Sequence, residues 1–160
     1  MKPHVKGPEV RETVIKAVTN LEKIGRESTI HGPLPRLHLL VIDDDPLFRK
    51  VIAVIGETRG IAVTACGTLQ EIEAVALPDV FDTAIIDYYL DGIRRDYKGI
   101  MIARRLGQTP IILVSRRGQC LIDNQVWPAT VREFIDKSKG ANVILDCALR
   151  IKEKEEKAVV

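Results

Sequence analysis

The sequence predicts an α/β protein built on one parallel sheet of five strands, and three observations predict this class. Hydrophobic residues make up 46% of the chain but aromatic residues only 4%, so aliphatic side chains must form the core. From Leu37 onward, short aliphatic runs of the kind found in buried parallel strands alternate with amphipathic stretches. Such alternation predicts right-handed crossover connections with helices covering the sheet.

The first 36 residues are predicted to form a helix and a linker. In residues 9–24, apolar side chains recur at spacings of four and three, which marks one face of a helix. These residues are Val10, Val14, Ala17, Leu21 and Ile24. Gly25 can end the helix, and the prolines and glycine of residues 28–36 indicate a linker. Packing against the protein's own domain and formation of a homodimer through this helix both stay open.

Ten further elements are predicted after the linker. The strands are Leu37–Ile42, Ile61–Cys66, Phe81–Asp87, Pro110–Ser115 and Val131–Asp136. The helices, each following a strand, are Pro46–Glu57, Leu69–Leu77, Gly99–Leu106, Gly118–Gln125 and Asn142–Lys157. The first of these helices carries apolar residues on one side, at Leu47, Val51, Val54 and Ile55. We therefore expect a domain over residues 37–152, preceded by residues 1–36 and followed by a charged helical tail over 153–160.

Polar residues follow four of the five predicted strands. In an open parallel sheet, functional sites lie outside the carboxyl ends of the strands. The residues at these ends are Asp43, Asp44, Asp45, Asp87, Ser115, Asp136 and Lys137. Asp45 precedes Pro46 and is explained as the N-cap of a helix that has proline in its first turn. That explanation does not extend to Asp43 and Asp44.

The strand-end residues fit phosphoryl transfer to a carboxylate. Two adjacent carboxylates after a buried strand repel each other, and Mg²⁺ prefers such oxygen ligands. An aspartate can act as a nucleophile and carry an acyl phosphate, provided that a cation neutralises the charge around it. Lys137 can pair with phosphoryl oxygens, and the Ser115 hydroxyl can donate to another. These residues predict phosphorylation of Asp87 beside Mg²⁺ held near Asp43 and Asp44.

Four motifs in this order resemble the receiver domains of bacterial two-component response regulators. They are LLVIDDDP, AIIDYYLDG, PIILVSR and REFIDKS, and the resemblance extends from Leu37 to Lys152. It implies a flavodoxin-like (βα)5 fold, a three-layer sandwich whose parallel strands have the order 2-1-3-4-5. It also implies a phospho-accepting signalling protein rather than an enzyme, with a histidine kinase or a histidine phosphotransfer protein as phosphodonor.

The resemblance implies a role for each matching residue. Asp43 and Asp44 match the acidic pair of the metal site, Asp87 the phospho-acceptor, and Tyr89 the residue whose backbone carbonyl completes the metal site. Ser115 and Phe134 match the two switch residues, and Lys137 matches the family's lysine. Phosphorylation would then alter the face formed by the fourth helix, fifth strand and fifth helix.

The sequence departs from the family pattern at three places. Arg116 stands where a small residue is usual, and Ser138 where proline is usual. The loop from Asp87 to Gly99 is longer than usual and lacks the common proline after the acceptor. Only a charged tail follows the predicted fifth helix, so the output is expected to be protein binding, phosphorelay or an action of the amino-terminal helix.

Two alternative functions stay open. A phosphohydrolase of the haloacid dehalogenase type would use Asp43 as nucleophile and Asp45 as general acid. A degenerate receiver would bind an unknown downstream protein without being phosphorylated, and Arg116 and Ser138 motivate that reading.

Composition excludes several other classes. Net charge is +2 with the signs mixed along the chain, unlike the clustered basic surface of a nucleic-acid-binding protein. No apolar run reaches the ~18 residues of a membrane span. The three cysteines form no paired motif, so neither a disulfide framework nor a zinc site is indicated. We expect a reduced, cytoplasmic protein.

Overall fold

The computed structural model describes residues 34–75, 81–93, 99–116 and 127–159. The chain divides into two compact units, Met1–Leu34 and Pro35–Val160, and the helices and strands described below belong to the second unit. The helices predicted at residues 9–24 and 118–125, and nearly all of the predicted linker, lie outside the described residues. A homodimer through the first of these helices therefore stays a prediction.

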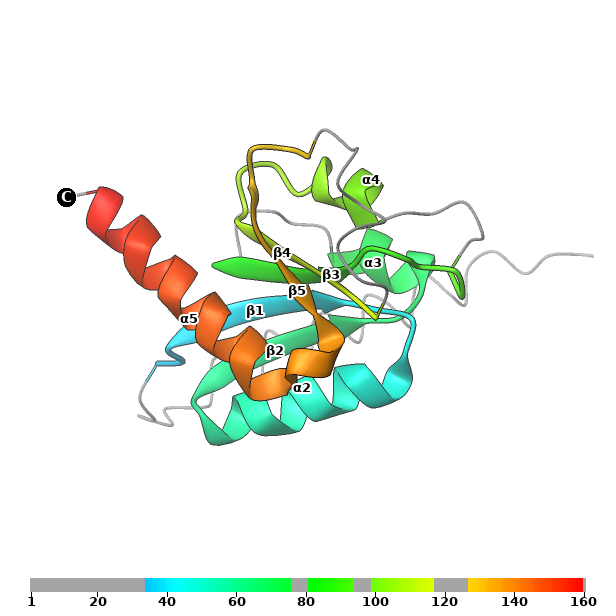
Figure 1. The fold of residues 1–160 in the computed structure, drawn as a ribbon, viewed down its shortest axis with the longest axis horizontal. Helices are drawn as coiled ribbons and strands as arrows, with labels where there is room; N and C mark the ends of the chain where they lie inside the picture. Colours follow the sequence, from blue (N-terminus) through cyan, green and yellow to red (C-terminus); the bar gives the residue numbers. More distant parts are fainter. Residues whose placement is uncertain (1–33, 76–80, 94–98, 117–126, 160) are drawn as a thin grey trace, which may run out of the picture. The chain divides into compact units, whose positions relative to one another are not determined.

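The second unit contains the predicted parallel sheet, with strand order β2-β1-β3-β4-β5 (Figure 1). The strands are β1 (Leu37–Ile42), β2 (Ile61–Cys66), β3 (Thr83–Asp87), β4 (Ile111–Ser115) and β5 (Val131–Asp136). Three of them have the predicted bounds, while β3 and β4 begin two residues and one residue later than predicted. The flavodoxin-like fold and its strand order are confirmed.

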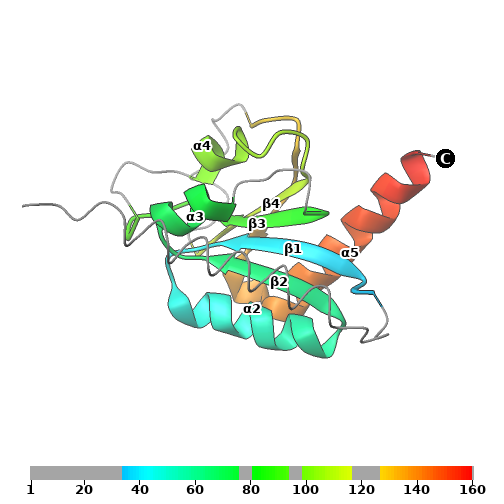
Figure 2. The ribbon, with the colours of Figure 1, turned by 180° about the vertical axis from the view of Figure 1, so that it is seen from behind.

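Helices cover both faces of the sheet. Their bounds are α2 (Pro46–Thr58), α3 (Leu69–Val75), α4 (Gly99–Ala103) and α5 (Ala141–Ala158), with a 3₁₀ turn, η3 (Lys137–Lys139), before α5. Figures 1 and 2 show α2 and α5 on one face and α3 and α4 on the other. Helix α4 ends three residues earlier than predicted, because the backbone tightens there into turns in which Arg105 N donates to Ile102 O and Leu106 N to Ala103 O.

The sheet separates two apolar clusters, because successive side chains of each strand point to opposite faces of the sheet. Leu37, Leu39 and Val41 of β1 pack with residues of α2 and α5, such as Ile52 and Ile144. The alternate residues of β1 pack on the other side with α4. They are Leu40 and Ile42. The central strands β1, β3 and β4 are therefore buried almost throughout on both faces, which is why they lack an apolar–polar alternation, whereas the edge strands β2 and β5 are partly exposed.

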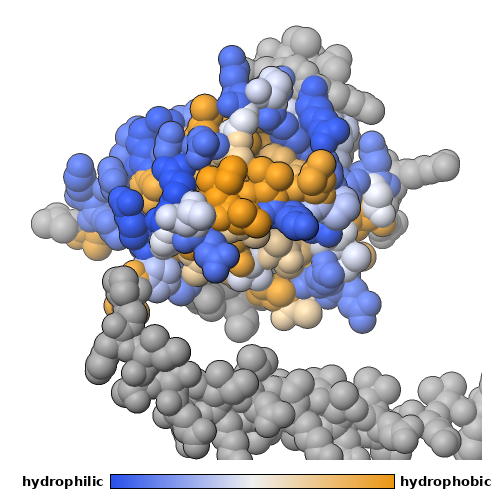
Figure 3. All heavy atoms as spheres, turned by 90° about the horizontal axis from the view of Figure 1, so that it is seen from below, coloured by the Kyte–Doolittle hydropathy of each residue, from blue (hydrophilic) through white to orange (hydrophobic). Residues whose placement is uncertain are grey.

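Helix α2 does not use the predicted apolar side for its main core contact. Its buried residues are Ile52 and Gly56, whereas Leu47 is 66% exposed and Val51 and Val54 are also exposed. Seen from the side of α2, Figure 3 shows an apolar area among hydrophilic side chains. The helix has apolar residues around much of its circumference, so apolar spacing alone did not determine which side faces the sheet.

The strand register brings the predicted polar residues to one edge. Ile42 of β1 pairs with Ile86 of β3, Asp87 with Val114 of β4, and Ser115 with Asp136 of β5. The residues that follow β1, β3, β4 and β5 therefore meet at the carboxyl edge of the sheet. Among the helices that the structure describes, none combines the length and the apolar character needed to cross a bilayer.

Candidate functional site

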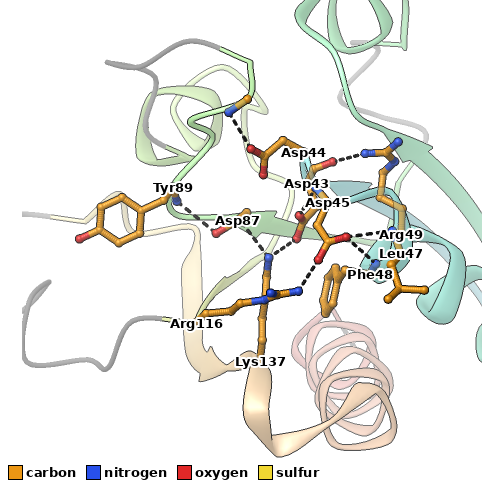
Figure 4. Close-up of polar contacts among 11 residues, drawn as sticks. Asp43, Asp44, Asp45, Leu47, Phe48, Arg49, Asp87, Tyr89, Arg116 and Lys137 are labelled. Carbon is orange, nitrogen blue, oxygen red and sulfur yellow. Dashed lines mark hydrogen bonds and ion pairs between the residues drawn. The ribbon is translucent and has the colours of Figure 1, made fainter.

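Three carboxylates meet at the carboxyl edge of the sheet. Each of Asp43, Asp44 and Asp87 offers an oxygen, and these oxygens all lie within 4.8 Å of one another (Figure 4). Asp43 is fully buried, Asp87 is buried, and Asp44 is half-buried. Hard oxygen donors at this separation are the kind of ligand set that Mg²⁺ takes from proteins.

Lys137 places its ammonium group between two of these carboxylates. Its Nζ lies 2.8 Å from Asp87 Oδ2 and 2.6 Å from Asp43 Oδ2, and the side chain is only 6% exposed. The contact to Asp87 is also a hydrogen bond, whereas Asp43 Oδ2 has no hydrogen-bond partner of good geometry among the described residues and is held by charge. The ring of Phe48 packs beneath the ammonium, with Nζ 4.6 Å from the ring centroid.

The buried acids are not fully compensated by this one cation. Desolvation by burial raises the pKa of Asp87 to about 6, and the nearby charge of Asp43 adds to this against the lowering effect of Lys137. Burial likewise raises the pKa of Asp43, although Lys137 and the N–H of Asp45 oppose it. Two neighbouring acids whose pKa values are raised, with one ammonium group between them, form a site that can accept a further cation.

Asp44 is held by a backbone group that the sequence did not reveal. Gly92 N donates to Asp44 Oδ2 at 2.7 Å. A Cβ at Gly92 would lie 2.7 Å from that same oxygen, so any other side chain would displace the carboxylate. Residue 92 is therefore a positioning residue for Asp44, and its glycine within the acidic loop was the only sequence signal.

Asp45 is confirmed as the N-cap of α2 and has a second partner. Its Oδ1 accepts from Leu47 N at 2.9 Å and Phe48 N at 3.3 Å, while Oδ2 forms an ion pair with Arg116. Although partial burial opposes it, these backbone hydrogen bonds and the Arg116 charge keep the pKa of Asp45 below its usual value. The pair joins the loop after β1 to the loop after β4.

Arg49 fixes the acidic loop from behind. Its Nη1 donates to the Asp43 carbonyl at 2.6 Å, and its guanidinium packs against Gly67 after β2. Sequence reasoning missed this residue, which stands one helical turn after Asp45. That spacing was its only signal.

A pocket of about 220 Å³ opens over the acidic cluster. It is lined by Asp44, Asp45, Asp87, Tyr89, Asp91, Ser115, Arg116 and Lys137. Asp43 does not line it and lies below, covered by the other residues. An anion entering this pocket would reach the Asp87 carboxylate between the charges of Lys137 and Arg116.

The remaining predicted residues lie at or near this pocket. Tyr89 lines it, and Tyr89 N donates to Asp87 Oδ1 at 3.1 Å. Phe134 lies outside the pocket and packs on Trp127, with ring centroids 6.0 Å apart. Asp136 caps η3 by accepting from Ser138 N at 2.8 Å, and the described residues contain no cis peptide bond.

Comparison with known proteins agrees with this fold. The response regulator receiver domain family matches residues 39–148. The chain therefore belongs to this family, the receiver domains of two-component systems. Members of the family interact with histidine kinases and generally bind Mg²⁺ at an acidic cluster. In this chain, Asp43, Asp44 and Asp87 form an acidic cluster.

Individual relatives are distant. Transcriptional activator protein PfeR of Pseudomonas aeruginosa is 32% identical over 89 residues, which are 55% of this chain and 28% of that protein. A CheY-like receiver domain protein from Methanospirillum hungatei matches with a TM-score of 0.63 at 19% identity, over 76% of this chain and 98% of that one. TrrA of Thermotoga maritima, solved with Mg²⁺–BeF, matches with a TM-score of 0.59 at 19% identity, over 72% and 98%. The chain spans 28% of the length of PfeR and 52% of the length of a second curated relative, Nodulation protein W of Bradyrhizobium diazoefficiens.

Proposed function

We propose that this chain accepts a phosphoryl group on Asp87, with Mg²⁺ bound beside it, and so switches a protein-interaction face. One observation carries the proposal. The Asp87 carboxylate lines an open pocket, and its Oδ2 lies 2.8 Å from a lysine ammonium that is itself almost fully buried. A carboxylate exposed to a pocket and flanked by a fixed cation is suited to attack a phosphorus atom.

The chemical step needs only groups that line the pocket. A carboxylate oxygen of Asp87 attacks phosphorus, a new P–O bond forms, and the bond from phosphorus to the donor atom breaks. The donor atom, a histidine nitrogen or the oxygen of a small acyl phosphate, leaves with the electron pair. Lys137 remains as the counter-charge, and the Ser115 hydroxyl donates to a phosphoryl oxygen.

The acidic cluster fits Mg²⁺. Asp43, Asp44 and Asp87 supply hard oxygens within 4.8 Å of one another, and burial raises the pKa of two of them. We assign the metal to these three carboxylates and to the backbone carbonyl of Tyr89. When bound, Mg²⁺ would neutralise the negative charge of the carboxylates and of the incoming phosphoryl group. TrrA, a distant relative with the same fold, has been solved in complex with Mg²⁺–BeF.

The phosphohydrolase alternative is less well supported. It requires Asp43 to act as nucleophile, but Asp43 is fully buried and does not line the pocket. Its Oδ1 accepts from Asp45 N at 2.9 Å and its Oδ2 lies against Lys137. Asp43 therefore has no oxygen open to the pocket for attack on phosphorus, although its Oδ2, which accepts no hydrogen bond, can still contribute to the metal site. We propose a signalling phospho-acceptor and not a turnover enzyme.

The switch would involve Ser115 and Phe134, which stand on adjacent strands. Ser115 lines the pocket, and Phe134 packs on Trp127 beyond it. A shift of the Ser115 hydroxyl toward the phosphoryl group would favour a different packing of Phe134, which is how a local charge change biases two arrangements. The altered face would be read by a downstream protein, with no nucleic acid or membrane as partner.

The phosphodonor is proposed to be a histidine kinase or a histidine phosphotransfer protein. The exposed Leu47 of α2 lies beside the pocket rim, since Leu47 N donates to the pocket residue Asp45, and the exposed Val51 follows about one helical turn later. An apolar surface next to the acceptor supports approach of a protein donor there.

The buried free thiols of Cys66 and Cys147 support a reducing, cytoplasmic location. We propose that residues 37–152 form the receiver domain, with a helix and linker over residues 1–36 before it and a charged helical tail over residues 153–160 after it.

Intact-mass measurement tests the proposal. The full chain and its Asp87→Asn variant are incubated with Mg²⁺ and acetyl phosphate, and their intact masses are compared. In a second assay, turnover of a phosphate ester is measured for wild type, Asp43→Asn and Asp87→Asn. We expect one phosphoryl adduct on wild type, none on Asp87→Asn, and no ester turnover by wild type. Absence of an adduct with any donor would favour the degenerate receiver, and turnover abolished by Asp43→Asn but not by Asp87→Asn would favour the phosphohydrolase.

A further inference from the structure

Arg116 stands at the rim of the pocket and has no part in the function proposed above. Its side chain is 68% exposed and forms an ion pair with Asp45 across the pocket mouth (Figure 4). It also lines a second hollow of about 350 Å³, together with Phe48, Asp136, Lys137 and Ser138. The guanidinium therefore lies between the acceptor pocket and this second hollow.

The strand register puts Arg116 within reach of the acceptor. Val114 pairs with Asp87 across the sheet, so Arg116 lies two residues beyond the level of the acceptor. Two strand residues rise roughly 6.6 Å, a distance that an extended arginine side chain spans. The same side chain can thus contact Asp45, as it does here, or turn into the pocket toward Asp87.

The charge of a phosphorylated Asp87 gives the Arg116 side chain a reason to turn into the pocket. Lys137 already lies against both Asp43 and Asp87 and, among the residues that the structure describes, is the one cationic residue besides Arg116 that lines the pocket. A phosphoryl group on Asp87 would replace one carboxylate charge by about two negative charges and three acceptor oxygens. One ammonium cannot serve all of these oxygens, whereas a guanidinium offers five donors in a planar fork.

We propose that Arg116 is a second phosphoryl-binding cation, held by Asp45 until a phosphoryl group occupies Asp87. This inference rests on the proposed phosphorylation of Asp87 and adds the group that recognises the phosphoryl oxygens. Asp45 competes with the phosphoryl group for the guanidinium, so it sets how strongly Arg116 binds the adduct. Once turned inward, Arg116 covers the adduct from solvent and slows its hydrolysis.

Two substitutions separate this role from a purely structural one. Arg116→Ala removes the cation. Asp45→Asn retains an N-cap of equal quality but no longer holds Arg116 by charge. Binding of Mg²⁺ plus beryllofluoride, a phosphoryl mimic, is measured by calorimetry on the full chain, and the half-life of the acetyl phosphate adduct by intact mass. Arg59→Ala is the matched control, because Arg59 pairs with Asp146 at the opposite end of α2.

The two variants are expected to change binding in opposite directions. Arg116→Ala weakens beryllofluoride binding about tenfold, the value of one charge-assisted hydrogen bond, and shortens the adduct's half-life. Arg116→Lys recovers part of this, Asp45→Asn strengthens binding, and Arg59→Ala leaves it unchanged. Wild-type affinity in Arg116→Ala, or weakened binding in Asp45→Asn, would overturn the inference while the adduct on wild type still upholds the proposed function. If wild type forms no adduct, the proposed function fails and this inference fails with it.

Discussion

Lys137 Nζ lies 2.8 Å from Asp87 Oδ2, and the same ammonium lies 2.6 Å from Asp43 Oδ2. One buried cation thus compensates two buried carboxylates, with Asp44 close by. The site is short of positive charge in the absence of metal, and that shortage makes it receptive to Mg²⁺ and sensitive to pH. The first three predictions below follow from this shortage.

Removal of the buried cation should destabilise the fold. Lys137→Met leaves Asp43 and Asp87 without a counter-charge, which should lower the free energy of unfolding by about 3 kcal/mol at pH 8. The loss should shrink below pH 6, where Asp87 holds a proton. Urea denaturation in EDTA measures both. Lys152→Met is the matched control, because Lys152 pairs with Asp82 at 3.2 Å in a more exposed setting; an equal loss in that variant would contradict the account.

Asp87→Asn should stabilise the metal-free protein above pH 6. The pKa of Asp87 is about 6 in the folded protein against 3.8 for a free side chain, so the folded state keeps a proton that the unfolded state releases. The contribution of Asp87 to the free energy of unfolding is therefore highest below pH 4 and falls as the pH rises through 6. Removing the charge should add about 2 kcal/mol at pH 8 and almost nothing at pH 4. Thermal unfolding across this range in EDTA tests the sign, and a gain that grows as pH falls would contradict it.

Mg²⁺ binding should depend on Gly92 although Gly92 offers no ligand side chain. Gly92→Ala would push the Asp44 carboxylate away, and loss of such a supporting contact should weaken Mg²⁺ affinity about tenfold. Asp44→Asn should weaken it at least as much. Calorimetric titration with Mg²⁺ measures both, with Asp146→Asn as control because Asp146 is exposed and pairs with Arg59 elsewhere. Unchanged affinity in Gly92→Ala would contradict the positioning role of Gly92, and unchanged affinity in Asp44→Asn would show that Asp44 does not hold the metal.

The single tryptophan should report the switch. Trp127 packs on Phe134 with ring centroids 6.0 Å apart, so a change in Phe134 alters its surroundings. Mg²⁺ plus beryllofluoride should shift Trp127 emission in wild type but not in Asp87→Asn, and Ser115→Ala should bind the mimic with a much smaller shift. A full shift in Ser115→Ala would remove Ser115 from the pathway.

Most of the fold could be predicted from the sequence. Buried parallel strands must be aliphatic, so their runs are easily located, and three of five strands have the predicted bounds. Helix α2 was the exception in orientation, because Phe48 and Ile52 compete with the predicted apolar side for the core. Of that side, Ile55 packs against the core, whereas Leu47 and the two valines are exposed. The end of α4 was also missed, since its last turn tightens without a proline or an immediate glycine to mark it.

The site could be predicted only as far as strand ends determine it. Residues that end β1, β3, β4 and β5 meet wherever a parallel sheet forms, so Asp87 and Lys137 could be brought together in advance. The contacts of Arg116 with Asp45 and of Gly92 with Asp44 connect different loops. Their partners depend on loop paths that no local spacing encodes. The contact of Arg49 with the Asp43 carbonyl is local, and its spacing from Asp45 was a signal that went unused.

The central claim is that the acceptor is Asp87, and chemical mapping tests it most directly. The full chain is phosphorylated with acetyl phosphate and Mg²⁺, and borohydride then reduces any aspartyl phosphate to homoserine, which peptide mass spectrometry locates. We expect homoserine at position 87 alone, and none in the metal-free control. Homoserine at position 43 or 44 instead, or at no position in a protein that carries a phosphoryl adduct, would contradict the account.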